Sequence, residues 1–156
     1  MPKTPLVAGH VTEVVPFLWA SDLERSLRFY VAGLGATVDR EWVVDGRLRW
    51  CRLGLGGAAL MLQERAPGHV LAAPPGAGMS LNFTCADALA LYDAALAGGL
   101  EPVREPQVGN GLWELGYADP DGYRINFASP TDLPEELLLS AYRAREPAAR
   151  QKKAVG

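Results

Sequence analysis

Few residues in this chain belong to the types that carry acid-base or metal chemistry. The only two histidines, His10 and His69, lie before the first predicted strand and in a Pro-Gly segment, which favours surface positions over catalytic ones. Glu13 and Glu64 lie near predicted strand ends. Glu114, in GLWELGY, has aromatic neighbours. It is either a ligand contact or the single solvent-facing acid that an alternating strand often carries. Sequence motifs of nucleophilic hydrolases, phosphate-binding loops and dinucleotide-binding turns do not occur.

The cysteines and the overall charge exclude further classes. Cys51 and Cys85 lie far apart in apolar segments, without zinc-site or disulfide spacing, and are predicted to be reduced core residues. A net charge of −3 and 49% apolar residues match neither a disordered chain nor a nucleic-acid binder. No apolar run could span a bilayer and the start lacks a signal-peptide pattern, so we expect a cytoplasmic protein without membrane partners.

The elements that must position these residues repeat once along the chain. We predict a single domain over residues 1–156, of which 13–65 form a first βαβββ module and 80–130 a second, joined by a Pro-, Gly- and Ala-rich connector at 66–79. The first helix is predicted to begin with a capping box of Ser21 and Glu24. The expected strands cover 13–20, 36–44, 47–55 and 58–64, then 80–86, 101–107, 111–118 and 123–129.

An offset of 65 residues superposes the two modules. It pairs Asp22 with Asp87 and Gly57 with Gly122, and the order of elements agrees throughout, which favours a duplicated unit. The fold class is therefore α+β. Residues 131–156 are predicted to form a C-terminal helix and tail, with Asp132 as the helix cap. Its apolar side would carry Leu137, Leu138 and Tyr142.

Three segments in this order carry a family resemblance: SDLERSLRFYVAGLG, LGLGGAALMLQE and ADPDGYRINF. They resemble the vicinal oxygen chelate superfamily, which includes glyoxalase I, extradiol dioxygenases, fosfomycin-resistance enzymes and bleomycin-resistance proteins. The resemblance covers residues 13–130 and implies two βαβββ modules that curl around a cavity. Function varies widely within such a fold and has to be argued from the site.

The resemblance also assigns four positions to metal ligands in the members that use a metal. Those positions are usually His, Gln or Glu, and in this chain they fall on Val15, Met61, Ser80 and Asn126. Divalent transition metals prefer imidazole, carboxylate or thiolate donors, which this set lacks. We therefore expect no metal, no cofactor and no catalytic residue, and the resemblance is greatest to the metal-free bleomycin-resistance proteins.

Strand alternation predicts which side chains line the cavity. If the apolar sets of each strand pack on the helices, the opposite sets face inward in one register common to four strands. The predicted ligand-binding residues are Phe17, Trp19, Met61, Gln63, Ser80, Asn82, Thr84, Glu114, Arg124 and Asn126. Trp42, Trp50 and Trp113 either extend this lining or belong to a core or a dimer interface. Aromatic walls with a few amides suit a planar or amphipathic ligand.

We predict a homodimer that binds a small aromatic or amphipathic molecule without a metal, with antibiotic sequestration as the most specific form. Bleomycin-resistance proteins, which this arrangement resembles, hold a flat cationic drug, and Asp39, Glu41, Glu105 and Glu114 are candidates for contacts to such a ligand; a solvated strand face explains these acids equally well. A metal-dependent glyoxalase or dioxygenase with displaced ligands and a small-molecule sensor are the alternatives. Residue types and spacing identify neither the ligand nor the pathway.

Overall fold

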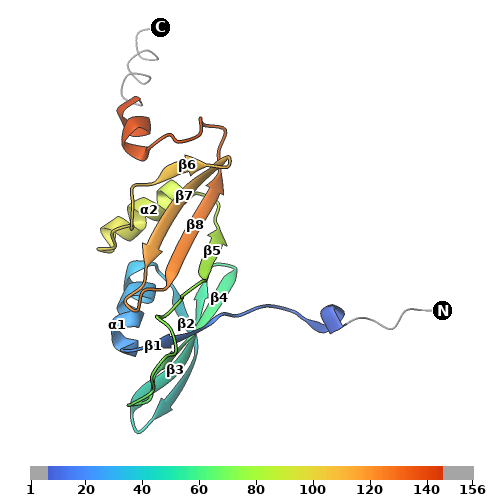
Figure 1. Cartoon of the computed structure of the whole chain (residues 1–156), viewed down its shortest axis with the longest axis vertical. Coiled ribbons are helices and arrows are strands. Elements are labelled where there is room, and N and C mark those ends of the chain that lie inside the picture. Colours follow the sequence, from blue (N-terminus) through green and yellow to red (C-terminus); the bar gives the residue numbers. More distant parts are fainter. Residues whose placement is uncertain (1–6, 146–156) are drawn as a thin grey trace, which may run out of the picture.

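Two four-stranded mixed sheets, each covered by one main helix, make up the body of the protein (Figure 1). The computed structural model describes residues 7–145. The first sheet has the order β1-β4-β3-β2 and the second the order β5-β8-β7-β6. The strands are β1 (Phe17–Ala20), β2 (Thr37–Val44), β3 (Arg47–Leu55), β4 (Ala58–Glu64), β5 (Ser80–Thr84), β6 (Gln107–Gly109), β7 (Leu112–Ala118) and β8 (Arg124–Pro130). The shared order confirms the predicted α+β fold with two βαβββ units.

The helices begin at equivalent residues in the two units. Asp22 caps α1 (Leu23–Leu27) by accepting a hydrogen bond from the Arg25 amide at 3.0 Å, and Asp87 caps α2 (Ala88–Ala97) from the Ala90 amide at 2.9 Å. These caps lie 65 residues apart, as the repeat predicts. The capping box of Ser21 and Glu24 was wrong, because the residue in the extended cap conformation is Asp22. Beyond α1 the helix continues as a π-helical segment, η2 (Arg28–Gly33).

The strands alternate between a buried helix-facing side and a more exposed inner side. Leu18, Leu60 and Leu62 are at most 1% exposed in the first sheet, and Ile125 and Phe127 at most 3% in the second. These residues belong to one apolar core that runs through both units. The alternation confirms the predicted register for β1, β4 and β8, and it leaves the opposite face of each sheet free for a site.

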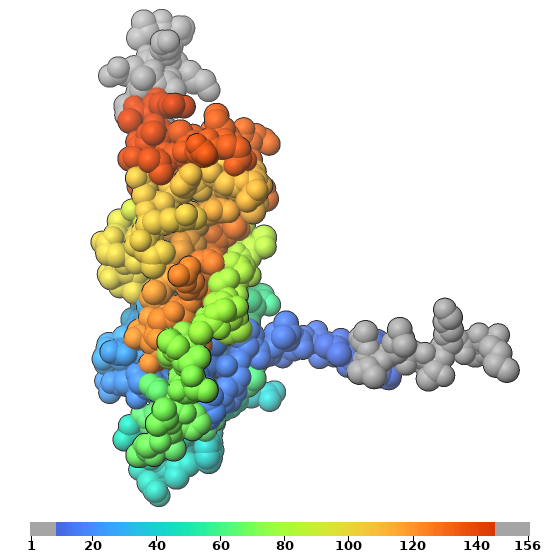
Figure 2. Space-filling view, viewed as in Figure 1, coloured from blue at the N-terminus to red at the C-terminus, as the bar shows by residue number. Residues whose placement is uncertain are grey.

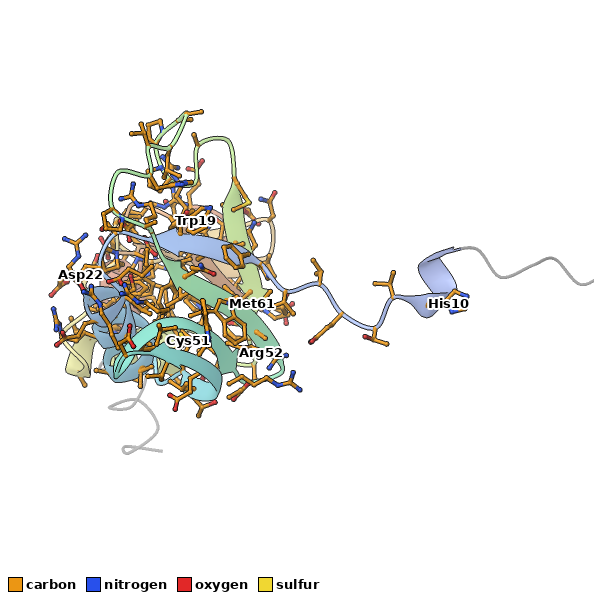
Figure 3. The ribbon with its side chains drawn as sticks, turned by 90° about the horizontal axis from the view of Figure 1, so that it is seen from below. His10, Trp19, Asp22, Cys51, Arg52 and Met61 are labelled. Carbon is orange, nitrogen blue, oxygen red and sulfur yellow. The ribbon has the colours of Figure 1, made fainter. Side chains whose placement is uncertain are left out.

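Two predicted strands differ most from the observed ones. Residues 13–16 lie outside β1, and residues 11–16 form an extended arm that leaves the body (Figures 1 and 3), where Val14 is 87% exposed. A 3-10 turn, η1 (Val7–His10), precedes the arm. The strand expected at 101–107 was wrong: β6 covers Gln107–Gly109 and shares only Gln107 with it. Pro102 and Pro106 have no amide hydrogen to donate to a ladder, and residues 101–106 form no strand.

The segment after β8 covers the outer edge of the second sheet. The Val108 amide donates to the Leu137 carbonyl at 3.0 Å, and the Leu139 amide donates to the Pro106 carbonyl at 3.0 Å. Residues 139–145 then form the C-terminal helix. Asp132 as its cap was wrong, because residues 132–138 are used in this edge pairing and turn. The predicted tail at 146–156 lies outside the described residues.

A polar junction joins the two units. The Tyr30 hydroxyl donates to the buried Asp119 carboxylate at 2.8 Å, and Arg25 donates to the Pro120 carbonyl at 2.9 Å. The connector crosses this junction on the front of the molecule, shown in green in Figure 2. These contacts dock the turn after β7 on the first helix. The inner faces of the two sheets therefore lie at separate ends of an elongated chain (Figure 1). Within residues 7–145 no helix has the length and apolar character that crossing a membrane requires.

Candidate functional site

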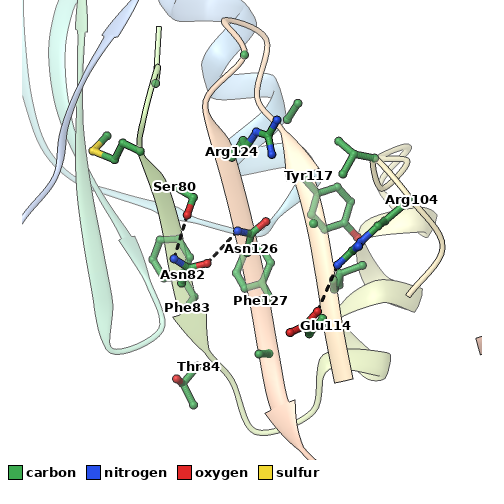
Figure 4. A pocket seen from close by; sticks show the side chains of 18 of the residues that line it. Ser80, Asn82, Phe83, Thr84, Arg104, Glu114, Tyr117, Arg124, Asn126 and Phe127 are labelled. Atoms are coloured by element: carbon green, nitrogen blue, oxygen red, sulfur yellow. Dashed lines mark hydrogen bonds and ion pairs between the residues drawn. The ribbon is translucent and has the colours of Figure 1, made fainter. Parts of the chain in front are cut away.

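An open trough of about 1190 Å³ lies over the inner face of the second sheet (Figure 4). Its floor comes from β5, β7 and β8, and its sides from residues 75–79 of the connector and from Val103 and Arg104 before β6. Since no residue of the first sheet lines it, the trough belongs to the second unit alone.

A chain of hydrogen-bonded amides runs across the floor. Asn82 and Asn126 are register partners on the parallel strands β5 and β8, so their side chains share one face. The Asn126 Nδ2 donates to the Asn82 Oδ1 at 2.8 Å, and the Asn82 Nδ2 donates to the Ser80 Oγ at 3.1 Å (Figure 4). This chain orients the amides and leaves further donor and acceptor capacity for a ligand.

A glycine makes room for the central amide. Gly116 on β7 is the register partner of Asn126, and a Cβ at this position would lie 3.0 Å from the Asn126 Oδ1. In the first unit the equivalent residue is Arg52, the register partner of Met61. The span between these equivalent register pairs is one residue longer in the second unit, because Gly116 and Asn126 are ten positions apart whereas Arg52 and Met61 are nine.

The charged groups of the trough are unevenly matched. Arg104 lies 3.2 Å from Glu114, so these two side chains neutralise each other. Arg124 also lines the trough, and no acidic side chain within residues 7–145 forms an ion pair with it. Arg124 is therefore a cation of the trough without an ion-pair partner in the described part of the chain.

The predicted ligand-binding residues separate into two groups. The trough brings together those of the second unit, namely Ser80, Asn82, Thr84, Glu114, Arg124 and Asn126. Phe17, Trp19, Met61 and Gln63 lie instead on the inner face of the first sheet. One chain does not enclose both groups in a single cavity.

The inner face of the first sheet is aromatic. Its register aligns Trp42, Trp50, Gln63 and Trp19 in one row across four strands. Trp42 is 54% exposed and Phe17 is 43% exposed, whereas Trp19 and Trp50 are half-buried. His69 of the connector packs on Trp19 with ring centroids 5.0 Å apart, so the wall is only partly covered in the single chain. Phe17 packs against Trp19 with ring centroids 5.3 Å apart. By contrast, Trp113 is 5% exposed and packs on Tyr142, which makes it a core residue.

Acids near the first sheet are also paired. Arg52 donates to Asp39 at 2.8 Å and to Glu13 at 3.1 Å. Glu64 forms ion pairs with Arg47 and Arg49 at 2.5 and 2.8 Å. The carboxylates of Glu13, Asp39 and Glu64 are therefore each paired with an arginine.

The donor set does not fit a transition metal. Val15 and Met61 offer no ligand of the required kind, and Ser80 and Asn126 offer neutral oxygens that are part of or next to the amide chain. Among the described residues, no three His, Cys, Asp or Glu side chains are grouped so as to hold an ion.

The thiols and the phenol near the sheets are poorly suited to act as nucleophiles. Burial raises the pKa of Cys51 to about 11 and raises that of Cys85 as well. Burial likewise raises the pKa of Tyr117, a residue of the trough wall, to about 12. All three groups therefore stay protonated near neutral pH.

Sequence reasoning missed the side walls of the trough. Arg104 and Val103 come from a segment that was predicted as a strand, and Gly76 to Met79 come from the connector. Loop positions carry no alternation, so their side-chain directions cannot be inferred from periodicity. The one sequence signal for this wall was the charge of Arg104, which follows Glu101 by three residues.

These features agree with the comparison to known families. Residues 8–127 match the family model of the Glyoxalase/Bleomycin resistance protein/Dioxygenase superfamily, and the chain belongs to this family. The family resemblance predicted from the three sequence segments is thereby confirmed. A search of curated proteins found no match.

Solved structures share the fold at low sequence identity. TioX from Micromonospora sp. ML1 is 21% identical, with a TM-score of 0.63 over 77% of this chain and 99% of its own. TnmS3, an antibiotic binding protein from Streptomyces sp. CB03234, is 22% identical, with a TM-score of 0.59 over 77% and 98%. A bleomycin-binding protein complexed with bleomycin is 18% identical, with a TM-score of 0.55 over 76% and 98%.

Proposed function

We propose that this protein binds a small aromatic or amphipathic molecule without a metal and sequesters it, as in antibiotic resistance. The observation that carries this proposal is the amide chain from Ser80 through Asn82 to Asn126. Neutral amides at the centre of an open trough orient a ligand but offer neither a strong base nor a metal ligand. The antibiotic- and bleomycin-binding proteins of the same fold support this choice of ligand class.

A second copy of the chain would complete the site. The second sheet presents a polar trough, and the first sheet presents an aromatic wall on which Phe17 and Trp42 stay exposed. Pairing the wall of one chain with the trough of another would enclose a planar ligand between aromatic faces and orienting amides. It would also cover the exposed apolar residues of the wall, which an isolated chain leaves in water. A homodimer is therefore part of the proposal.

The cytoplasm is the proposed compartment. Cys51 and Cys85 are both free thiols, which fits a reducing environment.

Thermal unfolding with a panel of planar antibiotics of both charge signs, with metal-free bleomycin among the cationic ones, tests the proposal. A ligand at a hundredfold excess over its Kd stabilises the folded state by about 2.7 kcal/mol. We expect this stabilisation to survive treatment with EDTA and to be reduced by Asn126→Ala and by Trp42→Ala. Val70→Ala is the control, because Val70 is 86% exposed on the connector and does not line the trough.

Two results would contradict the proposal. Binding that EDTA abolishes and a divalent ion restores would favour a metal-dependent enzyme with other ligands. Binding that Asn126→Ala leaves unchanged would place the ligand elsewhere. Sedimentation at several protein concentrations tests the dimer separately, and a monomer that still loses affinity on Trp42→Ala would contradict the shared site.

A further inference from the structure

The hydrogen-bond chain on the trough floor has a direction. Asn126 donates to Asn82, and Asn82 in turn donates to the Ser80 hydroxyl oxygen. Since that oxygen accepts, the hydroxyl proton of Ser80 points away from the chain, and it has no acceptor among residues 7–145. The chain therefore ends in a hydrogen-bond donor.

A cation comes from the strand next to this donor. Ser80 and Arg124 are register partners on the adjacent parallel strands β5 and β8, and both line the trough (Figure 4). The other register partner of Arg124 is Ala118 on β7, and the next inward residue on β8 is Asn126. These neighbours are neutral, and Glu114 is the only acid among the described residues that line the trough. The guanidinium and the hydroxyl are therefore two donors of the same trough, on adjacent strands, without an anionic partner in residues 7–145.

The acids that a cationic ligand would need are engaged elsewhere. Glu114 is paired with Arg104, and Asp39 is paired with Arg52. Glu105 accepts a hydrogen bond from the Ser140 amide at 2.6 Å and does not line the trough. Glu41 is the register partner of the fully buried Cys51, which puts it on the helix side of the first sheet. The lining of the trough thus has a net positive charge.

We propose that the ligand is an anionic aromatic molecule whose carboxylate, or an equivalent acidic group, binds between the Ser80 hydroxyl and the Arg124 guanidinium. This inference rests on the proposed function, since it names the ligand class of the same trough. A planar guanidinium and a hydroxyl together match the oxygens of a carboxylate, and hydrogen bonds between charged groups are about twice as strong as neutral ones. The aromatic part would then lie over the amide chain.

Three pyrene probes of nearly equal size test the charge preference: pyrene-1-carboxylate, pyrene-1-carboxamide and 1-pyrenemethylammonium. Their affinities for the full chain are measured by fluorescence titration at low and high salt. We expect the carboxylate to bind about tenfold more tightly than the carboxamide, and the ammonium to bind most weakly. High salt should reduce the advantage of the carboxylate, because the trough is open to solvent.

Variants assign the preference to named groups. Arg124→Gln should bring the carboxylate to the affinity of the carboxamide, while the carboxamide itself changes little. Ser80→Ala should reduce the preference for the carboxylate by a smaller factor. Arg28→Gln is the matched control, since Arg28 is exposed on η2 and pairs with Glu24. Thermal unfolding checks that each variant is folded.

The outcomes separate this inference from the proposed function. Equal binding of the three probes, or tighter binding of the ammonium, would overturn the anionic preference and leave aromatic binding intact. A preference for the carboxylate that persists in Arg124→Gln would also overturn it. Failure of all three probes to bind would contradict both proposals.

Discussion

The two halves of the molecule share one scaffold and differ in what they present on it. Both have the same strand order and an aspartate cap at the same place. The inner face of the first sheet carries three tryptophans in its four strands, Trp19, Trp42 and Trp50, whereas the inner face of the second carries the amides Asn82 and Asn126. Duplication therefore preserved the buried sides of the strands and allowed the inner sides to diverge, because only the buried sides are constrained by the core.

The sheet edges differ as well. The outer strand of the second sheet, β6, is covered by residues 136–139. The outer strand of the first sheet, β2, pairs only with β3 in the described part of the chain, and seven of its eight residues are exposed. Register shifts interrupt β2 near Asp39 and again after Trp42. Such irregularities make an open edge less able to pair with other chains.

Removing the cover of the second sheet should have the largest effect on stability. Leu139 is 3% exposed and packs in a small core with Val108 and Trp113. We expect Leu139→Ala to lower the free energy of unfolding by roughly 3 kcal/mol, since it deletes buried methyl groups and leaves a cavity. Chemical denaturation measures the loss.

The matched change on the uncovered edge is Val43→Ala on β2, where the side chain is 48% exposed. It should cost less than about 0.5 kcal/mol. Similar losses for the two variants would mean that the edges are equally covered in solution.

Breaking the junction between the halves should have the next largest effect. Asp119 accepts hydrogen bonds from the Tyr30 hydroxyl and from the amides of Asp121 and Tyr123, at 2.8 to 2.9 Å. Asp119→Ala leaves these donors without partners and should lower the free energy of unfolding by roughly 2 kcal/mol. Thermal and chemical unfolding both report it.

Asp119→Asn is the control for this variant. Its amide oxygen can still accept from the two backbone amides, and its NH2 group can donate to the Tyr30 oxygen. We expect it to cost less than about 1 kcal/mol. An equal loss in the free energy of unfolding for both substitutions would show that charge, rather than hydrogen bonding, stabilises the junction.

The smallest expected effect is a pH dependence at the same residue. Burial raises the pKa of Asp119 above its usual 3.8, and this outweighs the hydrogen bonds from Tyr30, Tyr123 and Asp121, which lower it. Between the unfolded and the folded pKa the folded state therefore keeps a proton that the unfolded state has lost. The stability that Asp119 contributes is fully present below the unfolded pKa and falls as the pH rises through the folded one.

Denaturation of the wild type and of Asp119→Asn at several pH values measures this contribution. The stability of the wild type relative to the variant should decline as the pH increases from about 4. A relative stability that increases over this range would show that the hydrogen bonds dominate and that the folded pKa is lowered.

The sequence predicted β3 and β4 with their observed bounds and assigned the inner faces of β4, β5 and β8 correctly. Strong alternation, such as that of Tyr123, Ile125 and Phe127, leaves only one register that buries the apolar set. It failed where local signals compete. Ser21 and Asp22 are both good cap residues, and only the backbone conformation selects between them.

The amino-acid sequence by itself determined the repeat and the buried side of β1, β4, β5 and β8. These properties depend on residue type and on a period of two, which are local. Only the tertiary structure decided that the aromatic wall and the amide trough lie apart in one chain. That separation depends on the contact of Tyr30 with Asp119, 89 residues apart, and on the docking of a turn against a helix, and no local pattern encodes such a contact.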